Sequence, residues 1–211
     1  IVESDAHAIA LSHHWFGQAR DLDDFVIVSL EQTLGLALLH NGQVFRGAGG
    51  LSHNLGDLVL GATSEETLRL SAVAGETAIF GEQQLVGHFA EAVRLGRGMA
   101  HAQALIASEN NPLSGAAIRA GEAVGLAIAN IVTLFGPPRV IIVGSTLGLG
   151  AVFTDSLQQS YSRAIPSSIS EVAELVFDQS TDEAWAQGAA VVALRELYES
   201  PWGTTGPASS L

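Results

Sequence analysis

The chain has 211 residues, of which 47% are hydrophobic, so it holds enough apolar material for the core of one large domain or two small ones. Its formal charge of −13 combines 22 acidic residues with nine arginines, and the chain contains no lysine and no cysteine. This composition excludes a basic face for direct nucleic-acid binding, lysine-dependent P-loop or Schiff-base chemistry, disulfide bonds and thiolate zinc sites.

The apolar runs and the two ends of the chain bear on its location. Every long apolar run is interrupted by Gly, Asn or Pro well short of about 18 residues, which predicts that no segment spans a membrane and that the protein is cytoplasmic. Ile1 is not a methionine, and no signal-peptide or transit-peptide pattern follows it, so we expect a fragment. Residues 199–211 are rich in Gly, Pro, Ser and Thr and are expected to form a flexible tail.

Strand and helix signals alternate along the rest of the chain. In chain order, the predicted elements are a helix at Asp5–Ala19, strands at Phe25–Leu30, Gly35–Leu39 and Val44–Phe45, an extended segment at Leu55–Leu60, helices at Ser64–Val73, Gln83–Leu95, Met99–Ser108 and Leu113–Phe135, a strand at Val140–Val143, a helix at Ala151–Ala164, a strand at Val172–Phe177 and a helix at Asp182–Tyr198. This order predicts an α/β fold, in which a mixed five-stranded sheet carries flanking helices and a helical insert at about residues 64–110.

Five short motifs carry a family resemblance. They are VESDAH at residues 2–7, EQTLG at 31–35, RGAGGLSHNLGD at 46–57, PRVIIVGS at 138–145 and AQGAA at 186–190. They are similar, in the same order, to the patterns VxNDAN, GTGIG, RGxxGxAGExGH, PxxIVxGG and AxGAA in the second lobe of the ROK family (repressors, open reading frames and sugar kinases). The resemblance covers residues 1 to about 198 and implies an actin-like ATPase lobe of the ribonuclease H-like type. It implies an interlobe helix at 1–20 and the second lobe at 21–198, whereas the first lobe and any winged helix are absent from this chain.

The resemblance implies a ligand site around Asp5. In the sugar kinases of the family this aspartate is the general base that acts on the sugar hydroxyl, and Ser4 and His7 replace two asparagines beside it. The alternative is that Asp5 only caps its helix. Asn54 stands where the family has a sugar-binding glutamate, and Asp57 stands where it has a histidine shared between sugar and zinc; both side chains can still hydrogen-bond a polyol. The candidate ligand-binding residues are Ser4, Asp5, Gly50, His53, Asn54 and Asp57.

The nucleotide loop that the resemblance implies is altered in this chain. The family loop is glycine-rich because backbone amides must approach phosphate, whereas Glu31 and Thr33 replace two of the glycines. A glutamate at this place repels a triphosphate, so we expect no ATP binding and no cofactor. The residues of this degenerate nucleotide loop are Gln32, Thr33, Gly35, Gly144 and Ser145.

A metal site is not expected. The zinc-binding stretch CxCGxxGCLE of the family has no counterpart here, and Arg69 stands where that stretch has a sugar-binding glutamate. The chain also lacks the HxxxH and HExxH patterns of histidine metal sites. His13 replaces a glutamate of the family and is expected at the surface of its helix.

Three functions remain open. The first is the effector-sensing and dimerisation domain of a ROK-type transcriptional regulator, which binds a sugar or polyol without phosphorylating it and contacts DNA only through a domain missing from this chain. The second is an ATP-dependent sugar kinase with Asp5 as the catalytic residue, and the third is a noncatalytic scaffold lobe with no ligand. A homodimer is expected through apolar helix faces of the insert, at Leu85, Phe89, Val93, Met99, Leu105 and Ile106.

Overall fold

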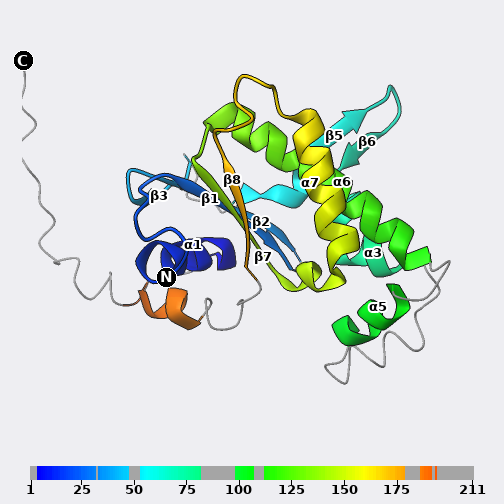
Figure 1. The fold of residues 1–211 in the computed structure, drawn as a ribbon, viewed down its shortest axis with the longest axis horizontal. Coiled ribbons are helices and arrows are strands. Elements are labelled where there is room, and N and C mark those ends of the chain that lie inside the picture. Colours follow the sequence, from blue (N-terminus) through cyan, green and yellow to red (C-terminus); the bar gives the residue numbers. More distant parts are fainter. Residues whose placement is uncertain are drawn as a thin grey trace, which may run out of the picture.

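A computed structural model of the chain describes residues 4–31, 33–47, 53–81, 98–106, 112–178, 186–191 and 193. The helices are α1 (Asp5–Trp15), α2 (Ser71–Ala74), α3 (Glu76–Gly81), α5 (Gly98–Ile106), α6 (Pro112–Phe135) and α7 (Ala151–Ala164), with the short 3-10 helices η1 (Leu55–Asp57) and η2 (Ser145–Leu149). The strands are β1 (Phe25–Leu30), β2 (Leu34–His40), β3 (Gln43–Val44), β4 (His53–Asn54), β5 (Val59–Ala62), β6 (Thr67–Arg69), β7 (Arg139–Val143) and β8 (Glu174–Asp178). Residues 186–191 form a further helical segment near α1 (Figure 1).

The main sheet is built around β1, whose six residues are all buried. This strand pairs antiparallel with β2 and parallel with β7, and β7 pairs parallel with β8. The strand order is β3-β2-β1-β7-β8, and β4 pairs with β2 beside this path. The predicted mixed five-stranded sheet is therefore confirmed, and β4 adds a short strand that the sequence pattern did not indicate.

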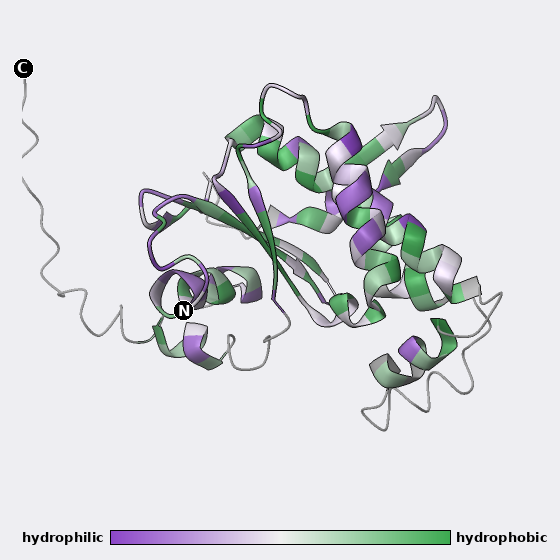
Figure 2. Ribbon diagram, viewed as in Figure 1, coloured by the Kyte–Doolittle hydropathy of each residue, from purple (hydrophilic) through white to green (hydrophobic). Residues whose placement is uncertain are grey.

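Helices cover both faces of this sheet (Figure 1). Val26, Val28 and Leu30 of β1 belong to the larger apolar cluster, which they share with α6 and α7. Phe25 and Ile27 belong to a second cluster, which they share with α1. Because successive strand residues point to opposite faces, a strand covered on both faces is apolar at most positions, and in β1 only Ser29 is polar. Figure 2 shows the same apolar character along the central strands.

The helices α6 and α7 pack against each other at very short range. A Cβ atom added at Gly125 of α6 would overlap the carbonyl oxygen of Leu157 in α7 and would lie 2.9 Å from the Ser160 Cβ atom. The Ser160 hydroxyl also donates a 2.8 Å hydrogen bond to the Glu122 carbonyl oxygen. The contact between the two helices therefore depends on a missing side chain at this position.

Among the described residues, α6 is the one helix long and apolar enough, by length and composition, to cross a membrane, over Leu113–Phe135. However, 56% of its apolar window is buried inside the protein, where it contributes Ala117, Val124 and Ile128 to the larger cluster. The core of the lobe therefore accounts for the apolar character of this helix.

The sequence prediction is wrong between residues 55 and 70. The expected extended segment at Leu55–Leu60 begins as η1, and most of the expected helix at Ser64–Val73 belongs to the hairpin β5–β6. The Thr63 hydroxyl oxygen accepts hydrogen bonds from the backbone N–H groups of Glu65 (3.3 Å) and Glu66 (3.0 Å). Such side-chain bonds to nearby backbone compete with helix formation, and here they close the hairpin turn.

Other expected elements agree more closely with the structure. The strand expected at Val172–Phe177 begins at Glu174, and the helix expected at Asp5–Ala19 ends at Trp15. The expected helix at Gln83–Leu95 lies outside the described residues.

We expect Gly125→Ala to lower the free energy of unfolding by about 1–3 kcal/mol, because the added methyl group forces α6 away from the α7 backbone. Equilibrium denaturation with urea measures this change. Gly115→Ala on the same helix is the matched control, since its added Cβ atom would meet only the end of the Arg119 side chain, at 3.5 Å. That control should gain up to about 1 kcal/mol from helix propensity. Equal effects of the two variants would contradict the close-contact argument.

Candidate functional site

The N-terminal end of α1 presents Asp5. Ser4 is the N-cap of this helix: its hydroxyl oxygen accepts a 3.3 Å hydrogen bond from the His7 backbone N–H. Asp5 is the first helical residue and is exposed, and its carboxylate makes no hydrogen bond or ion pair with the other described residues. Ser4 and not Asp5 is therefore the N-cap of α1, and the Asp5 carboxylate is exposed in the first turn of the helix.

The structure brings α1, β2 and β4 together beside Asp5. A Cβ atom added at Gly35 would lie 3.1 Å from the Ala6 Cβ atom, so the first turn of α1 rests on the start of β2. Gly35 is in turn paired with Asn54 of β4. The predicted ligand residues Ser4 and Asp5 therefore lie in the same region as Asn54 and its loop.

Asn54 and Asp57 hold each other in a fixed arrangement. The Asn54 amide nitrogen donates a 2.7 Å hydrogen bond to Asp57 Oδ2, and Asn54 Oδ1 accepts a 3.1 Å bond from the Gly56 backbone N–H. Arg69 of β6 donates from Nη1 to the Asp57 carbonyl oxygen (2.8 Å) and lies 3.7 Å from Asp57 Oδ1. One Asn54 N–H and the other lone pairs of Asp57 remain able to bond a ligand hydroxyl. The sequence places Arg69 near this site but gives no sign that it pairs with Asp57.

Glu31 lies at the predicted nucleotide loop and reaches across to the end of a neighbouring strand. Its carboxylate accepts a 3.0 Å bond from the Ser145 backbone N–H and a 2.7 Å bond from the Ser145 hydroxyl. Gly144 has a φ of 128°, and a Cβ atom there would overlap the Leu30 backbone. Such a φ and so close an approach favour glycine. Thr33 is exposed in the turn between β1 and β2.

Of three further predicted site residues, two are not described and one is described by its backbone alone. Gln32 and Gly50 lie outside the described residues. The backbone of His53 belongs to β4, where it pairs with Leu36.

A pocket of about 600 Å³ lies elsewhere, at the opposite end of β1, where Phe45, Leu134 and Phe135 are among its lining residues. It contains none of the predicted site residues.

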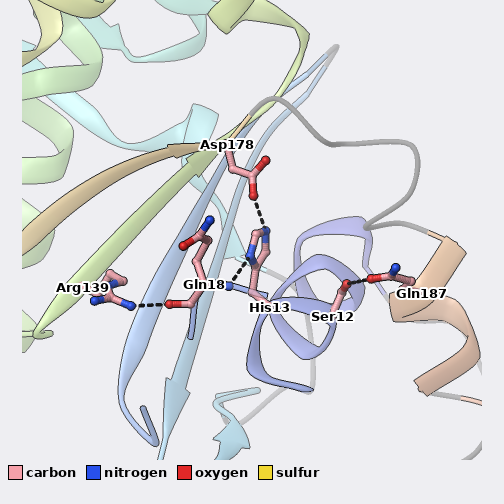
Figure 3. A network of polar contacts seen from close by, with 6 residues as sticks. All are labelled: Ser12, His13, Gln18, Arg139, Asp178 and Gln187. Carbon is pink, nitrogen blue, oxygen red and sulfur yellow. Dashed lines mark hydrogen bonds and ion pairs between the residues drawn. The ribbon is translucent and has the colours of Figure 1, made fainter. Parts of the chain in front are cut away.

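His13 is buried, which corrects its expected place at the helix surface. Its side chain is only 4% exposed; Nδ1 accepts a 3.4 Å bond from the Gln18 backbone N–H, and Nε2 lies 3.9 Å from Asp178 Oδ2 (Figure 3). The adjacent Ser12 hydroxyl donates a 3.2 Å bond to Gln187 in the helical segment 186–191. Burial lowers the pKa of His13 below its ordinary value of 6.5, and the Asp178 carboxylate opposes this shift in part. These contacts fix the C-terminal end of α1.

The described residues contain no group of three or more His, Asp or Glu side chains that could hold a metal ion. Carboxylate and amide groups beside Asp5 are instead the donors and acceptors that suit hydroxyl-rich ligands.

Comparison with known proteins gives the chain a family. The family model described as "ROK family" matches residues 1–196. The chain belongs to the ROK family. Its fold is the expected actin-like ATPase lobe: a ROK hexokinase from Thermus thermophilus superposes with a TM-score of 0.73 at 23% identity, over 92% of this chain and 64% of the hexokinase.

Two curated relatives of this ROK chain are named as regulators. The xylose repressor of Caldicellulosiruptor bescii is 22% identical over 171 residues, which is 75% of this chain and 43% of the repressor. The DNA-binding transcriptional dual regulator NagC of Escherichia coli (strain K12) is 25% identical over 153 residues, which is 68% of this chain and 37% of NagC. The chain therefore spans less than half the length of these relatives.

The lowered pKa of His13 predicts a pH dependence of stability. Because the folded state keeps His13 neutral and the unfolded state protonates near pH 6.5, stability is full above that pH and is lost as the pH falls toward the folded pKa. The loss cannot exceed about 1.4 kcal/mol per pH unit for one proton. We expect His13→Gln to remove this part of the slope in denaturant titrations above and below pH 6.5. Parallel stability curves for the wild type and the variant would show that His13 is not the group responsible.

Proposed function

We propose that this ROK chain is the effector-sensing and dimerisation part of a transcriptional regulator, which binds a sugar or sugar-like polyol and does not phosphorylate it. The proposal rests on a contrast between the predicted nucleotide loop and the start of α1. At the predicted nucleotide loop, the Glu31 carboxylate places a negative charge against Ser145. At the start of α1, the exposed Asp5 carboxylate has no partner among the described residues. A hydroxyl-bearing ligand fits the second region, and a triphosphate is repelled at the first.

The charge of the chain and its relatives support this proposal. Two relatives carry the names of regulators, and a structural neighbour with the same fold is a hexokinase. A net charge of −13 is unsuited to contact with a phosphate backbone, so DNA binding falls to a part of the protein outside this chain. The proposal also includes a cytoplasmic location and no bound zinc or other cofactor.

The ligand site proposed here consists of Ser4, Asp5, Gly50, His53, Asn54 and Asp57. Asp5 accepts hydrogen bonds from one or two hydroxyl groups. Asn54 contributes the N–H that it does not give to Asp57, and Asp57 accepts from a further hydroxyl. Ligand binding at this place changes how closely the lobe approaches the rest of the protein, which is the proposed signal.

The proposed homodimer uses the apolar faces of the helical insert. Leu85, Phe89 and Val93 lie outside the described residues, and so does the side chain of Met99. Leu105 and Ile106 lie at the end of α5, where both are half-buried against the larger cluster. Apolar helix faces that the core buries only in part are commonly buried against a second subunit.

A sugar kinase is the second candidate, because the exposed Asp5 carboxylate is the group that a general base requires. A coupled-enzyme assay of the complete protein with ATP, hexoses and amino sugars distinguishes the two. We expect no sugar-dependent ATP consumption. Turnover at typical kinase rates of about 1–100 per second would overturn the regulator proposal in favour of the kinase.

Substitution of Asp5 tests the ligand site directly. We expect Asp5→Ala to weaken sugar binding by about ten- to a hundredfold, because each charge-assisted hydrogen bond contributes about 1.5–3 kcal/mol where water is excluded. Isothermal titration calorimetry of the complete protein with a panel of mono- and disaccharides first identifies the ligand and then compares the variants.

Asp155→Ala is the matched control, since Asp155 is an exposed aspartate of α7 and its substitution makes the same change in charge. It should leave sugar affinity unchanged. Equal affinities of the wild type and Asp5→Ala for a confirmed sugar would place the site elsewhere. No binding by the wild type across the panel would instead favour the scaffold lobe without a ligand.

A further inference from the structure

Glu31 joins two strands that are neighbours in space but distant in sequence. It directly follows β1, and Ser145 begins η2 just after β7, 114 positions later. β1 and β7 run parallel, with Val28 opposite Ile142 and Ser29 opposite Val143. The carboxyl ends of both strands therefore meet at one edge of the sheet, and the Glu31 carboxylate bridges them.

The groups that hold this carboxylate are neutral. Its two oxygens accept one bond each, from the backbone N–H and the hydroxyl of Ser145, at 3.0 and 2.7 Å. Glu31 forms no ion pair with any arginine or histidine that the structure describes. A backbone N–H and a hydroxyl that converge on one anion are the donors with which protein loops bind phosphate oxygens. Ligands of open α/β sheets also bind at the carboxyl ends of parallel strands.

The backbone around Ser145 is shaped for this contact. Gly144 has a φ of 128° and passes so close to Leu30 that no side chain fits there. This path brings the end of β7 against the end of β1 and turns the Ser145 N–H toward Glu31. The donors are thus held by backbone that only glycine accommodates, independently of the Glu31 side chain.

We propose that the Glu31 carboxylate is an internal anion. It occupies the place beside the Ser145 N–H and hydroxyl, at the shared edge of β1 and β7, where an external anion would otherwise bind. It fastens η2 to that edge and excludes phosphate groups from it. This inference deepens the proposed function, because it gives a physical reason why a phosphate does not enter at the predicted nucleotide loop. Its test uses no sugar, so its failure is separate from a failure of sugar sensing.

The test is rescue of a Glu31→Ala variant by inorganic phosphate. In chloride, we expect the thermal midpoint of the variant to fall by about 2–6 °C, because two charge-assisted bonds are lost from a half-buried site. Millimolar phosphate at the same ionic strength should restore at least half of this loss, because it binds the vacated Ser145 donors in the folded state alone. Phosphate should not raise the thermal midpoint of the wild type above its value in chloride.

Glu65→Ala is the charge-matched control, since Glu65 is exposed in the hairpin turn and its backbone N–H, not its side chain, makes the described contact there. It should neither lose stability nor respond to phosphate. An unchanged midpoint for Glu31→Ala, a loss that phosphate does not restore, or an equal response of the wild type would each overturn the proposal.

Glu31→Gln provides a second measurement if the alanine variant does not fold, because glutamine preserves the shape but not the charge. We expect hydrogen exchange at the Ser145 amide to accelerate about five- to tenfold, since neutral acceptors bond more weakly than carboxylates. The Gly150 amide, which bonds the Leu147 carbonyl oxygen at 3.0 Å, serves as the internal reference. Equal exchange at Ser145 in the wild type and Glu31→Gln would overturn the proposal.

Discussion

Burial of β1 on both of its faces constrains the rest of the lobe. Because five of its six buried side chains are apolar, and they point to both faces, α1 must cover one face while α6 and α7 cover the other. Its backbone groups must also be paired on both sides, which fixes β2 and β7 as its neighbours. The end of β1, the start of β2 and the end of β7 therefore meet at one edge, and the polar residues of the candidate site are arranged around it.

The parts of the fold that could be predicted from sequence are those whose burial leaves a local pattern. FVIVSL and RVIIV each contain an unbroken run of four apolar residues, and both form buried strands close to their expected bounds. The helix α7 spans its predicted residues, and α6 begins one residue early, because a long apolar face needs no information from elsewhere in the chain. The hairpin β5–β6 could not be predicted this way, since the Thr63 hydroxyl decides its turn and its strands are mostly exposed.

The motifs propose where the candidate site lies, but they do not predict the contacts of its side chains. The family resemblance proposes Ser4, Asp5, Asn54 and Asp57 as one site, whereas the contacts of their side chains depend on tertiary structure. The bond from Ser145 to Glu31 requires knowledge that β1 and β7 are adjacent. The burial of His13 against Asp178 likewise requires β8 to lie beside α1. Local sequence patterns do not show that β1 lies beside β7 or that β8 lies beside α1, because each contact joins residues more than a hundred positions apart.

The attachment of α1 along its whole length has a mechanical consequence. Ser12 and His13 tie its C-terminal end to Gln187 and Asp178, while the Asp5 side chain at the other end makes no hydrogen bond or ion pair with the described residues. An α-helix of 11 residues is a stiff rod about 16 Å long. Because Ala6, Ile9 and Ala10 also pack on the sheet, a displacement at Asp5 shifts the whole rod against the sheet, and it reaches residues 186–191 directly through Gln187, 175 positions further along the chain than Ser12.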